Sequence, residues 1–299
     1  MNNPLMQRGN CPVCGSSESA DFLKNSIRKD KIGSLTFASR KKPEFMNYHL
    51  RKCSGCGLVY ACEHPVESEI ITSYEEAAFG SDSEADDAAR CYAALIRKNL
   101  PKNLGFAIDV GSGNGALLPL LSAMGFRKVT GYEPSAAAYA NASQEIKDNM
   151  VHGVFDENSI PDNSADLIII CMTLEHVLDP LRIVRNAYRK LAVGGRLFVT
   201  DHNYNAFINR FLGKKSPIID IEHLQLFNKN SLSFLLRESG FRIVRNASYW
   251  NRYKLSCFLM LLPIGGKFRQ ALEFLTKPFR NMMLQVPLGN RFAVGEKVS

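Results

Sequence analysis

The sequence predicts an α/β protein that combines a doubly wound, mostly parallel β-sheet with a small N-terminal metal-binding module. The sheet is predicted by a short apolar strand that leads into a glycine-rich turn at residues 104–118, and by later apolar runs that alternate with helix-like segments. The module is predicted by two CxxC pairs within residues 11–56. A chain of 299 residues is long enough for one large domain and one small one.

The composition favours a cytoplasmic protein without a membrane-spanning helix. Of the eight cysteines, only four fall into CxxC pairs, and the first residues show no charged segment followed by an apolar one, so we expect a reducing cytoplasm. The apolar stretch 255–264 is shorter than the ~20 residues that cross a bilayer. The net charge of +8 permits attraction to anionic metabolites, nucleic acid or lipid without deciding among them.

The N-terminal cysteines form two matched turns, each followed by glycine. Residues 11–15 read CPVCG and residues 53–57 read CSGCG. A CxxC turn can aim two thiolates at one ion, and two such turns complete a tetrahedral site, so we expect a structural zinc ion, with iron as the other metal that suits four thiolates. The alternative is four buried or redox-active thiols without metal. The predicted ligands are Cys11, Cys14, Cys53 and Cys56.

Two further residues near the second turn, Cys62 and His64, are expected to be ordinary loop residues, because four thiolates already fill a zinc shell. The segment that follows carries eight acids between Glu67 and Asp87 and no lysine or arginine. We expect it to be a connector that becomes helical around residues 85–98.

The glycine-rich turn has the pattern of a nucleotide-binding loop. Residues 104–118 read LGFAIDVGSGNGALL, a strand, a tight turn and a helix-compatible run. Glycine allows the backbone to turn sharply and a ligand to approach closely. Glu133 follows the next apolar run, where an acid can accept the ribose hydroxyls of an adenosine. Because Gly111, Gly113 and Ala116 also match a looser dinucleotide pattern, the loop alone leaves the cofactor open.

With Asp109 at the end of the strand, the loop resembles the first motif of class I S-adenosylmethionine-dependent methyltransferases, DxGxGxG. Residues 165–180 resemble the fourth strand and following loop of that family, and residues 221–244 its HLxxF segment, helix and sixth strand. The resemblance implies a Rossmann-like methyltransferase fold with a seven-stranded sheet, whose last strand, RFAVGEKV, is antiparallel and lies at an edge. Residues 11–60 are similar to the zinc-binding module found ahead of some C-methyltransferase and glycan-cluster methyltransferase domains.

This resemblance also implies the domain limits and the cofactor site. We expect a zinc-ribbon-like module at 1–66, the acidic connector at 67–103, and an S-adenosylmethionine-binding domain at 104–299 with an insertion at 250–289. The loop residues would line the methionine and ribose side, Glu133 would bind ribose, and two residues of the GVFDENSIPDNSAD segment would flank adenine. The implied cofactor-binding residues are Asp109, Gly111, Gly113, Gly115, Glu133, Phe155 and Asp156.

The catalytic prediction rests on histidine. Methyl transfer from a sulfonium is an in-line displacement that needs alignment and exclusion of water, and only an oxygen or nitrogen acceptor needs a general base. His176 and His202 follow the fourth and fifth strands, where ligands bind in doubly wound sheets, and His223 lies in the EHLQLF segment. We select His176 as the candidate base; the alternative is that it caps a helix or holds the loop.

The expected acceptor is a small molecule or a glycan precursor, such as a nucleotide sugar or a lipid-linked saccharide, by analogy alone. A nucleic acid partner is disfavoured because the zinc module lacks a dense basic face interleaved with aromatics and the connector is acidic. An RNA methyltransferase that holds its substrate with the zinc module and a non-catalytic S-adenosylmethionine-binding scaffold are the alternatives. Oligomeric state and acceptor atom are left open.

The insertion at 250–289 carries apolar residues at helical spacing and is flanked by bases. This pattern is typical of a basic amphipathic helix at a membrane surface, which would make the protein peripheral to the inner face of a membrane. A helical lid packed on the domain is the alternative, and Pro278 argues against one continuous helix. The apolar positions are Phe268, Leu272, Leu275 and Phe279, and the bases are Lys267, Arg269, Lys277 and Arg280.

Overall fold

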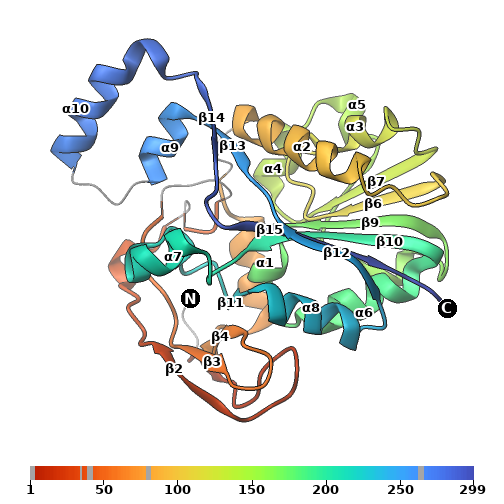
Figure 1. The fold of residues 1–299 in the computed structure, drawn as a ribbon, viewed down its shortest axis with the longest axis horizontal. Helices are drawn as coiled ribbons and strands as arrows, with labels where there is room; N and C mark the ends of the chain where they lie inside the picture. Colours follow the sequence, from red (N-terminus) through yellow and green to blue (C-terminus); the bar gives the residue numbers. More distant parts are fainter. Residues whose placement is uncertain (1–3, 34–35, 39–42, 79–81, 262–265) are drawn as a thin grey trace.

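A seven-stranded sheet forms the centre of the protein, which is represented by a computed structural model (Figure 1). The structure describes residues 4–33, 36–38, 43–78, 82–261 and 266–299. The strand order is β12-β15-β10-β9-β6-β7-β8, which confirms the predicted doubly wound, mostly parallel sheet. The strands are β6 (Phe106–Val110), β7 (Lys128–Glu133), β8 (Met150–His152), β9 (Ala165–Cys171), β10 (Leu191–His202), β12 (Arg242–Ser248) and β15 (Asn290–Glu296).

The middle strand β9 shows why both faces of the sheet are covered. Leu167 and Ile169 pack in one core cluster and Ile168 and Ile170 in the other, so alternate side chains point to opposite faces. Helices α2 (Asp82–Arg97) and α3 (Leu118–Ser122) cover the first face, and α6 (Pro180–Lys190) and α8 (Lys229–Glu238) the second (Figure 1). The short helices α4 (Ala136–Asn141) and α5 (Gln144–Lys147) connect β7 to β8.

The last strand, β15, is antiparallel as predicted, but it does not lie at an edge. It pairs with β10 on one side and with β12 on the other. Phe292, Ala293 and Val294 are buried, as expected of an interior strand, whereas β12 contains no buried residue and forms the edge. The prediction of an edge position is wrong because periodicity shows that a strand is buried without showing which strands flank it.

The N-terminal module is joined to the large domain by a shared sheet. Strands β2 (Ser19–Leu23), β3 (Leu50–Cys53) and β4 (Val59–Ala61) form an antiparallel sheet that β11 (Gln225–Leu226) extends. Gln225 pairs with Tyr60 and Leu226 with Val59. The short strands β1 (Met6–Gln7) and β5 (Glu63–His64) form a second pair, and η1 (Lys29–Lys31) is a single turn.

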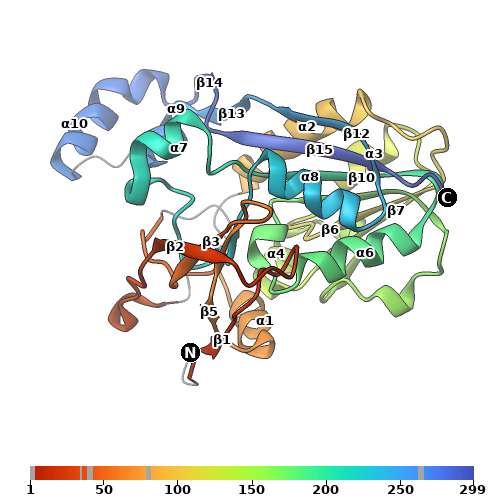
Figure 2. The same cartoon turned by 60° about the horizontal axis from the view of Figure 1, so that its bottom comes forward.

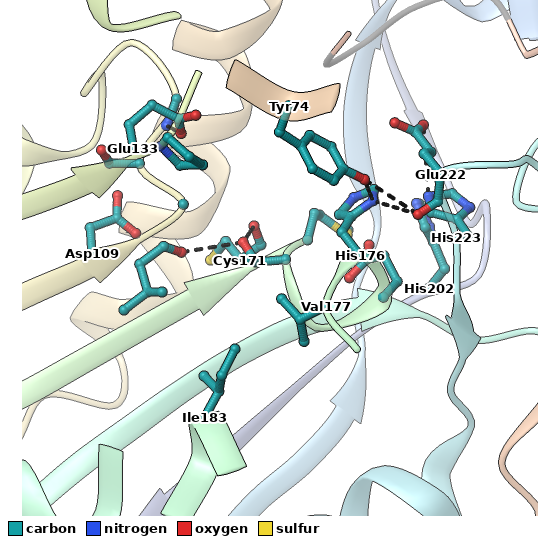
Figure 3. Close-up of a pocket in the computed structure, with 18 of the residues that line it drawn as sticks. Tyr74, Asp109, Glu133, Cys171, His176, Val177, Ile183, His202, Glu222 and His223 are labelled. Atoms are coloured by element: carbon teal, nitrogen blue, oxygen red, sulfur yellow. Dashed lines mark hydrogen bonds and ion pairs between the residues drawn. The ribbon is translucent and has the colours of Figure 1, made fainter. Parts of the chain in front are cut away.

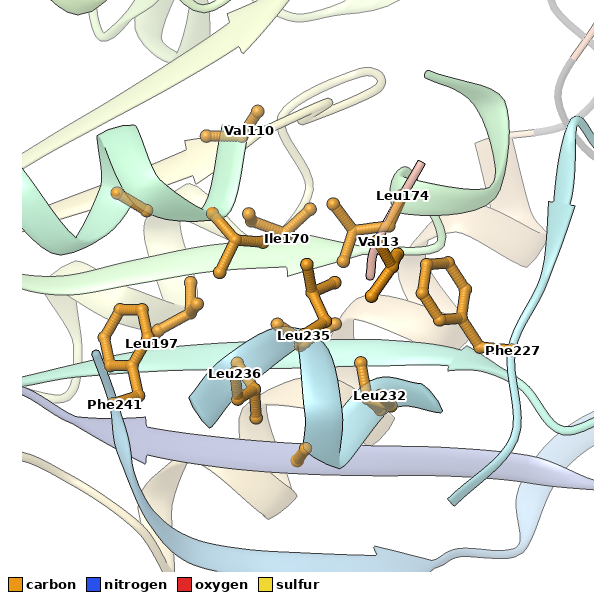
Figure 4. Close-up of a cluster of buried hydrophobic side chains, with 14 of the residues drawn as sticks. Val13, Val110, Ile170, Leu174, Leu197, Phe227, Leu232, Leu235, Leu236 and Phe241 are labelled. Carbon is orange, nitrogen blue, oxygen red and sulfur yellow. The ribbon is translucent and has the colours of Figure 1, made fainter. Parts of the chain in front are cut away.

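The core of the module is continuous with the core of the domain. Val13 packs in the same cluster as Leu174 of the large domain and as Leu232 and Leu235 of α8, and Figure 4 shows their side chains converging. Burial of these side chains stabilises the junction by about 1.5–3 kcal/mol for each large aliphatic residue. The module is therefore a structural part of the domain that it precedes.

The connector contains two helices, α1 (Glu67–Glu75) and the predicted helix α2. Tyr92 and Ile96 of α2 pack on the sheet with Leu121 of α3. The module, the connector and the large domain thus pack against one another. The domain boundaries at 66/67 and 103/104 stay predictions.

The segment between β12 and β15 forms a separate lobe with α7 (Phe207–Leu212) beside it (Figures 1 and 2). Helix α10 ends one residue before Lys277 and is followed by a turn at Pro278, as the proline indicated; the side chains of Lys267, Phe268 and Arg269 lie outside the described part. None of the described helices is long and apolar enough to cross a membrane. The elements are η4 (Gly213–Lys215), β13 (Asn251–Lys254), α9 (Leu255–Leu261), α10 (Gly266–Thr276), η5 (Lys277–Phe279) and β14 (Met283–Val286).

Candidate functional site

The four predicted cysteine ligands lie together in the N-terminal module. Their sulfurs are all within 4.8 Å of one another. The Sγ atoms of Cys11 and Cys56 are 3.6 Å apart, and those of Cys14 and Cys53 are 3.4 Å apart. A tetrahedral site with Zn–S bonds of about 2.3 Å has sulfurs about 3.8 Å apart, so the cluster fits a zinc ion.

Glycine closes each cysteine turn. Gly15 and Gly57 have φ of 72° and 75°, and their N–H groups donate to the carbonyls of Cys11 (2.9 Å) and Cys53 (3.1 Å). A hydrogen bond from the Cys56 thiol lowers the pKa of Cys11 to about 5, whereas the same contact raises the pKa of Cys56 and burial raises that of Cys14.

Cys62 and His64 stay outside this cluster among the described residues. The Cys62 thiol donates to the carbonyl of His49 (3.3 Å), and Nδ1 of His64 donates to the carbonyl of Pro65 (2.8 Å). His64 belongs to β5 and is not a loop residue.

The second cysteine turn is tied directly to the large domain. The Gly57 carbonyl accepts hydrogen bonds from the Tyr204 hydroxyl (2.6 Å) and from Nδ2 of Asn228 (2.9 Å). Asn228 also caps α8, because its side chain accepts from the N–H groups of Asn230 and Ser231. The second cysteine turn therefore helps to position the segment 222–228, which leads into α8.

Two buried acids lie at the carboxyl ends of the neighbouring strands β6 and β7, beside the switch point between β6 and β9 where the strand order reverses. Asp109 is 3% exposed and Glu133 is 8% exposed. Burial raises the pKa of each to about 7, with the neighbouring Glu133 adding to the shift of Asp109. Glu133 accepts hydrogen bonds from the N–H groups of Gly113 (2.7 Å) and Ser135 (2.8 Å).

The glycine loop needs its glycines for two different reasons. At Gly111, φ is 75° and a Cβ would lie 2.5 Å from Oγ1 of Thr173, so close packing excludes a side chain. At Gly113, φ is 59° and no described atom lies within 4 Å of the Cβ position, so the backbone borders open space in the cavity. The open side at Gly113 fits the close approach of a ligand. Gly115, the third loop glycine, also has a positive φ.

The two predicted adenine neighbours also reach this cavity. Phe155 and Asp156 both line it, and the Phe155 ring contacts Tyr132 edge to face with centroids 5.4 Å apart. The Asp156 carboxylate caps the turn η2 (Glu157–Ser159) by accepting from the N–H of Asn158 (2.8 Å). All seven predicted cofactor residues therefore lie at one end of the protein's sheet, and six of them line one cavity. The exception is Gly115, which is packed against Ile146 and Met150.

A single cavity of about 840 Å³ runs from these acids to a second group of polar side chains (Figure 3). This second group includes the predicted His176, which lies in the turn η3 (Leu174–His176) after β9. Nδ1 of His176 lies 2.8 Å from the Tyr74 hydroxyl and 3.1 Å from the carbonyl of Glu222. Three separate segments thus meet at His176.

The other two candidate histidines adjoin it. The rings of His176 and His223 are 5.0 Å apart, and those of His202 and His223 are 5.7 Å apart. Nδ1 of His223 donates to the carbonyl of Ile218 (2.8 Å), which leaves its Nε2 without a proton when the ring is neutral. Burial, together with the nearby His223, lowers the pKa of His202 to about 3, so His202 stays neutral.

Glu175 completes this group. Its carboxyl oxygens have no hydrogen-bond partner among the described residues, and burial raises its pKa to about 8. Ligand atoms of Glu175, His176 and His223 lie within 4.8 Å of one another, close enough to hold one divalent ion. The arrangement places the neutral His202 and two further imidazoles close to a buried acid.

Sequence reasoning missed Tyr74 and Glu222 as members of this site. Tyr74 lies in α1, within the predicted connector. The acids Glu67 and Glu69 after Pro65 are a helix-start pattern that could have predicted α1 from the sequence. Glu222 directly precedes the candidate His223, but its carbonyl group, which has no sequence signature, makes the contact to His176.

A glycine loop and two buried acids at the switch point of a doubly wound sheet define an α/β protein that binds a nucleoside-containing cofactor. Residues 85–246, more than half of the chain, match the model of a family described as "Methyltransferase domain". The chain belongs to this methyltransferase family.

Curated relatives match somewhat less than half of the chain. A Mycolicibacterium smegmatis protein named "Probable S-adenosylmethionine-dependent methyltransferase" is 28% identical over 138 residues, 46% of this chain and 51% of the relative. A Mycobacterium tuberculosis protein of the same description is 27% identical over 135 residues, 45% of this chain and 47% of the relative. The chain thus spans about half the length of the curated relatives it matches.

Solved structures with a similar fold include a SAM-dependent methyltransferase from Archaeoglobus fulgidus, with 19% identity, 70% of this chain and 94% of that chain covered, and a TM-score of 0.47. A putative methyltransferase from Bacillus halodurans has 17% identity, with 69% of this chain and 99% of that chain covered and a TM-score of 0.49.

Proposed function

We propose that the protein transfers a methyl group from S-adenosylmethionine to a small-molecule or glycan-precursor acceptor, such as a nucleotide sugar or a lipid-linked saccharide. The observation that carries the proposal is one continuous cavity with the acids Asp109 and Glu133 at one end and the cluster of Tyr74, His176 and His223 at the other. The first end fits a cationic nucleoside, and the second fits an acceptor that must lose a proton.

The residues at the first end suit the parts of the cofactor. Asp109 would face the positively charged methionine portion, and the Glu133 carboxylate would accept from the ribose hydroxyls. The open side of Gly113 leaves room for the ribose, and Phe155 and Asp156 would flank adenine. When bound, S-adenosylmethionine supplies an electrophilic methyl group.

The residues at the second end suit an oxygen, nitrogen or acidic carbon acceptor. His176 would take the proton that the acceptor loses, and His223 and Tyr74 would orient the acceptor and the base by hydrogen bonds. Exclusion of water by the buried walls would favour in-line attack.

We also propose that zinc occupies the cysteine cluster and that the protein acts in the cytoplasm. The zinc is structural, since four thiolates leave no open coordination position for a substrate. Thiolates that must stay reduced to bind metal support a reducing compartment.

Calorimetric titration with S-adenosylmethionine tests the cofactor assignment. Replacing Glu133 by alanine is expected to weaken binding about 10- to 100-fold, because hydrogen bonds to a charged group contribute about 1.5–3 kcal/mol. Glu145→Ala, which removes an exposed acid on α5, is the matched control and should bind as wild type does. Failure of the folded wild-type protein to bind S-adenosylmethionine, or preferential binding of NAD, contradicts the proposal.

Binding of S-adenosylmethionine should also depend on pH near 7. A cationic ligand favours the ionised form of Asp109, whose pKa is raised to about 7, so affinity should fall about tenfold between pH 8 and pH 6. Asp109→Asn should bind more weakly and show a smaller pH dependence, with the remainder due to Glu133, whose pKa is also raised to about 7. A wild-type affinity that is constant from pH 6 to pH 8 would refute the assigned role.

The unliganded protein should show the opposite trend in stability. Because the folded-state pKa values of Asp109 and Glu133 are raised from 3.8 and 4.5 to about 7, folding favours their protonated forms. Their contribution to the free energy of unfolding is therefore largest below their unfolded-state pKa values, and it is lost as pH rises toward 7.

The acceptor can be found by incubating the protein with labelled S-adenosylmethionine and fractionated extracts. Label in a metabolite or saccharide fraction supports the proposal, and label in RNA supports the RNA methyltransferase alternative. Tight cofactor binding without turnover in any fraction favours a scaffold.

A further inference from the structure

Six large apolar side chains are exposed at one end of the protein, on α7 and on the segment between β12 and β15. Phe207 and Phe211 of α7 are 84% and 75% exposed, and Phe274 and Leu275 of α10 are 77% and 70% exposed. Soluble proteins rarely expose such residues together unless the patch binds something. We call this set the end face; its members are Phe207, Phe211, Trp250, Phe274, Leu275 and Phe279.

The two parts of the end face lie at the same end of the molecule. Figures 1 and 2, seen from directions 60° apart, both place α7, α9 and α10 at the end opposite the C-terminus. Phe207 and Trp250 line one hollow of about 530 Å³ with Phe258 of α9. The members of the end face therefore lie at the same end of the molecule, and a hollow joins Phe207 to Trp250.

This surface also borders the acceptor end of the large cavity. Ile208 and Leu212 of α7 and Phe258 of α9 line that cavity, which continues to His176 and His223. Ile208 and Phe258 are shared with the hollow beside Phe207. A molecule held at the end face would lie next to the proposed acceptor site.

Bases accompany the apolar residues of the end face. No acid lies between Tyr204 and Ile219, a segment that contains three bases. The five exposed bases on these elements form no ion pair with another described residue. They are Arg210, Lys214, Lys215, Lys277 and Arg280.

Aromatic side chains next to unpaired bases match an anionic lipid bilayer. The aromatics can enter the boundary between headgroups and acyl chains, and the bases can remain with the lipid phosphates. A protein partner would need to supply acids to complement the bases, and a symmetric contact between two copies would place bases against bases, because residues 204–219 contain no acid. Charge complementarity therefore favours the bilayer.

We propose that the end face docks the protein onto an anionic bilayer and thereby presents the acceptor end of the cavity to lipid-linked molecules. Docking itself does not depend on the methyl-transfer function, whereas the access of lipid-linked acceptors rests on it. The sequence predicted membrane contact for residues 250–289 alone; the structure adds α7 as the second half of the surface.

Flotation with lipid vesicles tests the proposal on the full-length chain. Wild type should float with vesicles of phosphatidylcholine and phosphatidylglycerol, weakly with phosphatidylcholine alone, and less as salt is raised. Phe207→Ser/Phe211→Ser and Phe274→Ser/Leu275→Ser should each lower the partition coefficient on the order of tenfold or more. Lys214→Glu/Lys215→Glu should remove the preference for phosphatidylglycerol.

Matched substitutions elsewhere control for general effects on the surface. Val151→Ser/Val193→Ser removes two exposed apolar residues away from the end face, and Lys102→Glu reverses one exposed charge; both should bind vesicles as wild type does. Calorimetry with S-adenosylmethionine reports separately on cofactor binding, which the end-face variants should retain. If the wild-type protein does not bind S-adenosylmethionine, the proposed function is contradicted. The flotation experiment then still tests membrane docking by itself.

Two results would overturn the docking proposal. The first is absence of wild-type flotation with phosphatidylglycerol vesicles at low salt, or equal flotation of wild type and the phenylalanine variants. The second is a wild-type dimer in light scattering that the phenylalanine substitutions dissociate without any vesicle binding, which would assign the end face to a second copy of the chain.

Discussion

Replacing Cys14 by serine is expected to lower the free energy of unfolding by at least about 3 kcal/mol, or roughly 5–10 °C in Tm, because structural zinc contributes folding energy directly. Cys14 is chosen because it is the least buried of the four cluster cysteines. Cys62→Ser is the matched control, since Cys62 lies in the same module, stays outside the cluster and can keep its hydrogen bond to His49 as serine. Thermal unfolding and zinc content measured on both variants check this result.

Loss of the metal should destabilise both the N-terminal module and the residues at the acceptor end of the cavity. Pairing of β4 with β11 and the hydrogen bonds to the Gly57 carbonyl hold residues 222–228 in place. Chelation of the metal should therefore increase amide hydrogen exchange in 222–228 as well as in 50–62. Exchange confined to the module would show that the domain holds the Glu222 segment without the metal. A Cys14→Ser protein as stable as Cys62→Ser would contradict a structural metal.

The parts of this protein that could be predicted from sequence have short-range signatures. The cysteine turns are each complete within five residues, and the glycine loop lies between a strand and a helix that adjoin it. Glu133 follows from the length of one strand–helix–strand unit. Such spacings are fixed by the local backbone, so they hold whatever the rest of the chain does.

The parts that could not be predicted depend on contacts between distant segments. Tyr74 meets His176 across 102 positions, and the Gly57 carbonyl meets Asn228 across 171. The interior place of β15 depends on pairing with both β10 and β12. Hydrophobic periodicity shows which residues are buried but not which residues they pack against. The packing of the module against the large domain could therefore be seen only in the structure.

Replacing His176 by asparagine is expected to lower kcat by about 10²–10⁴-fold for an acceptor that must lose a proton, the usual contribution of a general base. His176 is the candidate base because it lies at the meeting point of Tyr74, the Glu222 carbonyl and His223, whereas burial lowers the pKa of His202 to about 3 and makes it a poor proton acceptor. His49→Asn is the matched control, because His49 pairs with Asp21 in the N-terminal module.

The pattern of the two neighbouring variants separates a base from a structural residue. His223→Asn should raise KM more than it lowers kcat if His223 orients the acceptor, and Tyr74→Phe should shift the pH dependence of kcat because the hydroxyl contacts Nδ1 of His176. Affinity for S-adenosylmethionine should be unchanged in all three, since the cofactor residues lie at the other end of the cavity. If His176→Asn keeps wild-type kcat on an acceptor with an ionisable oxygen or nitrogen, the base must be another group, and a carbon acceptor that needs no base becomes the better explanation.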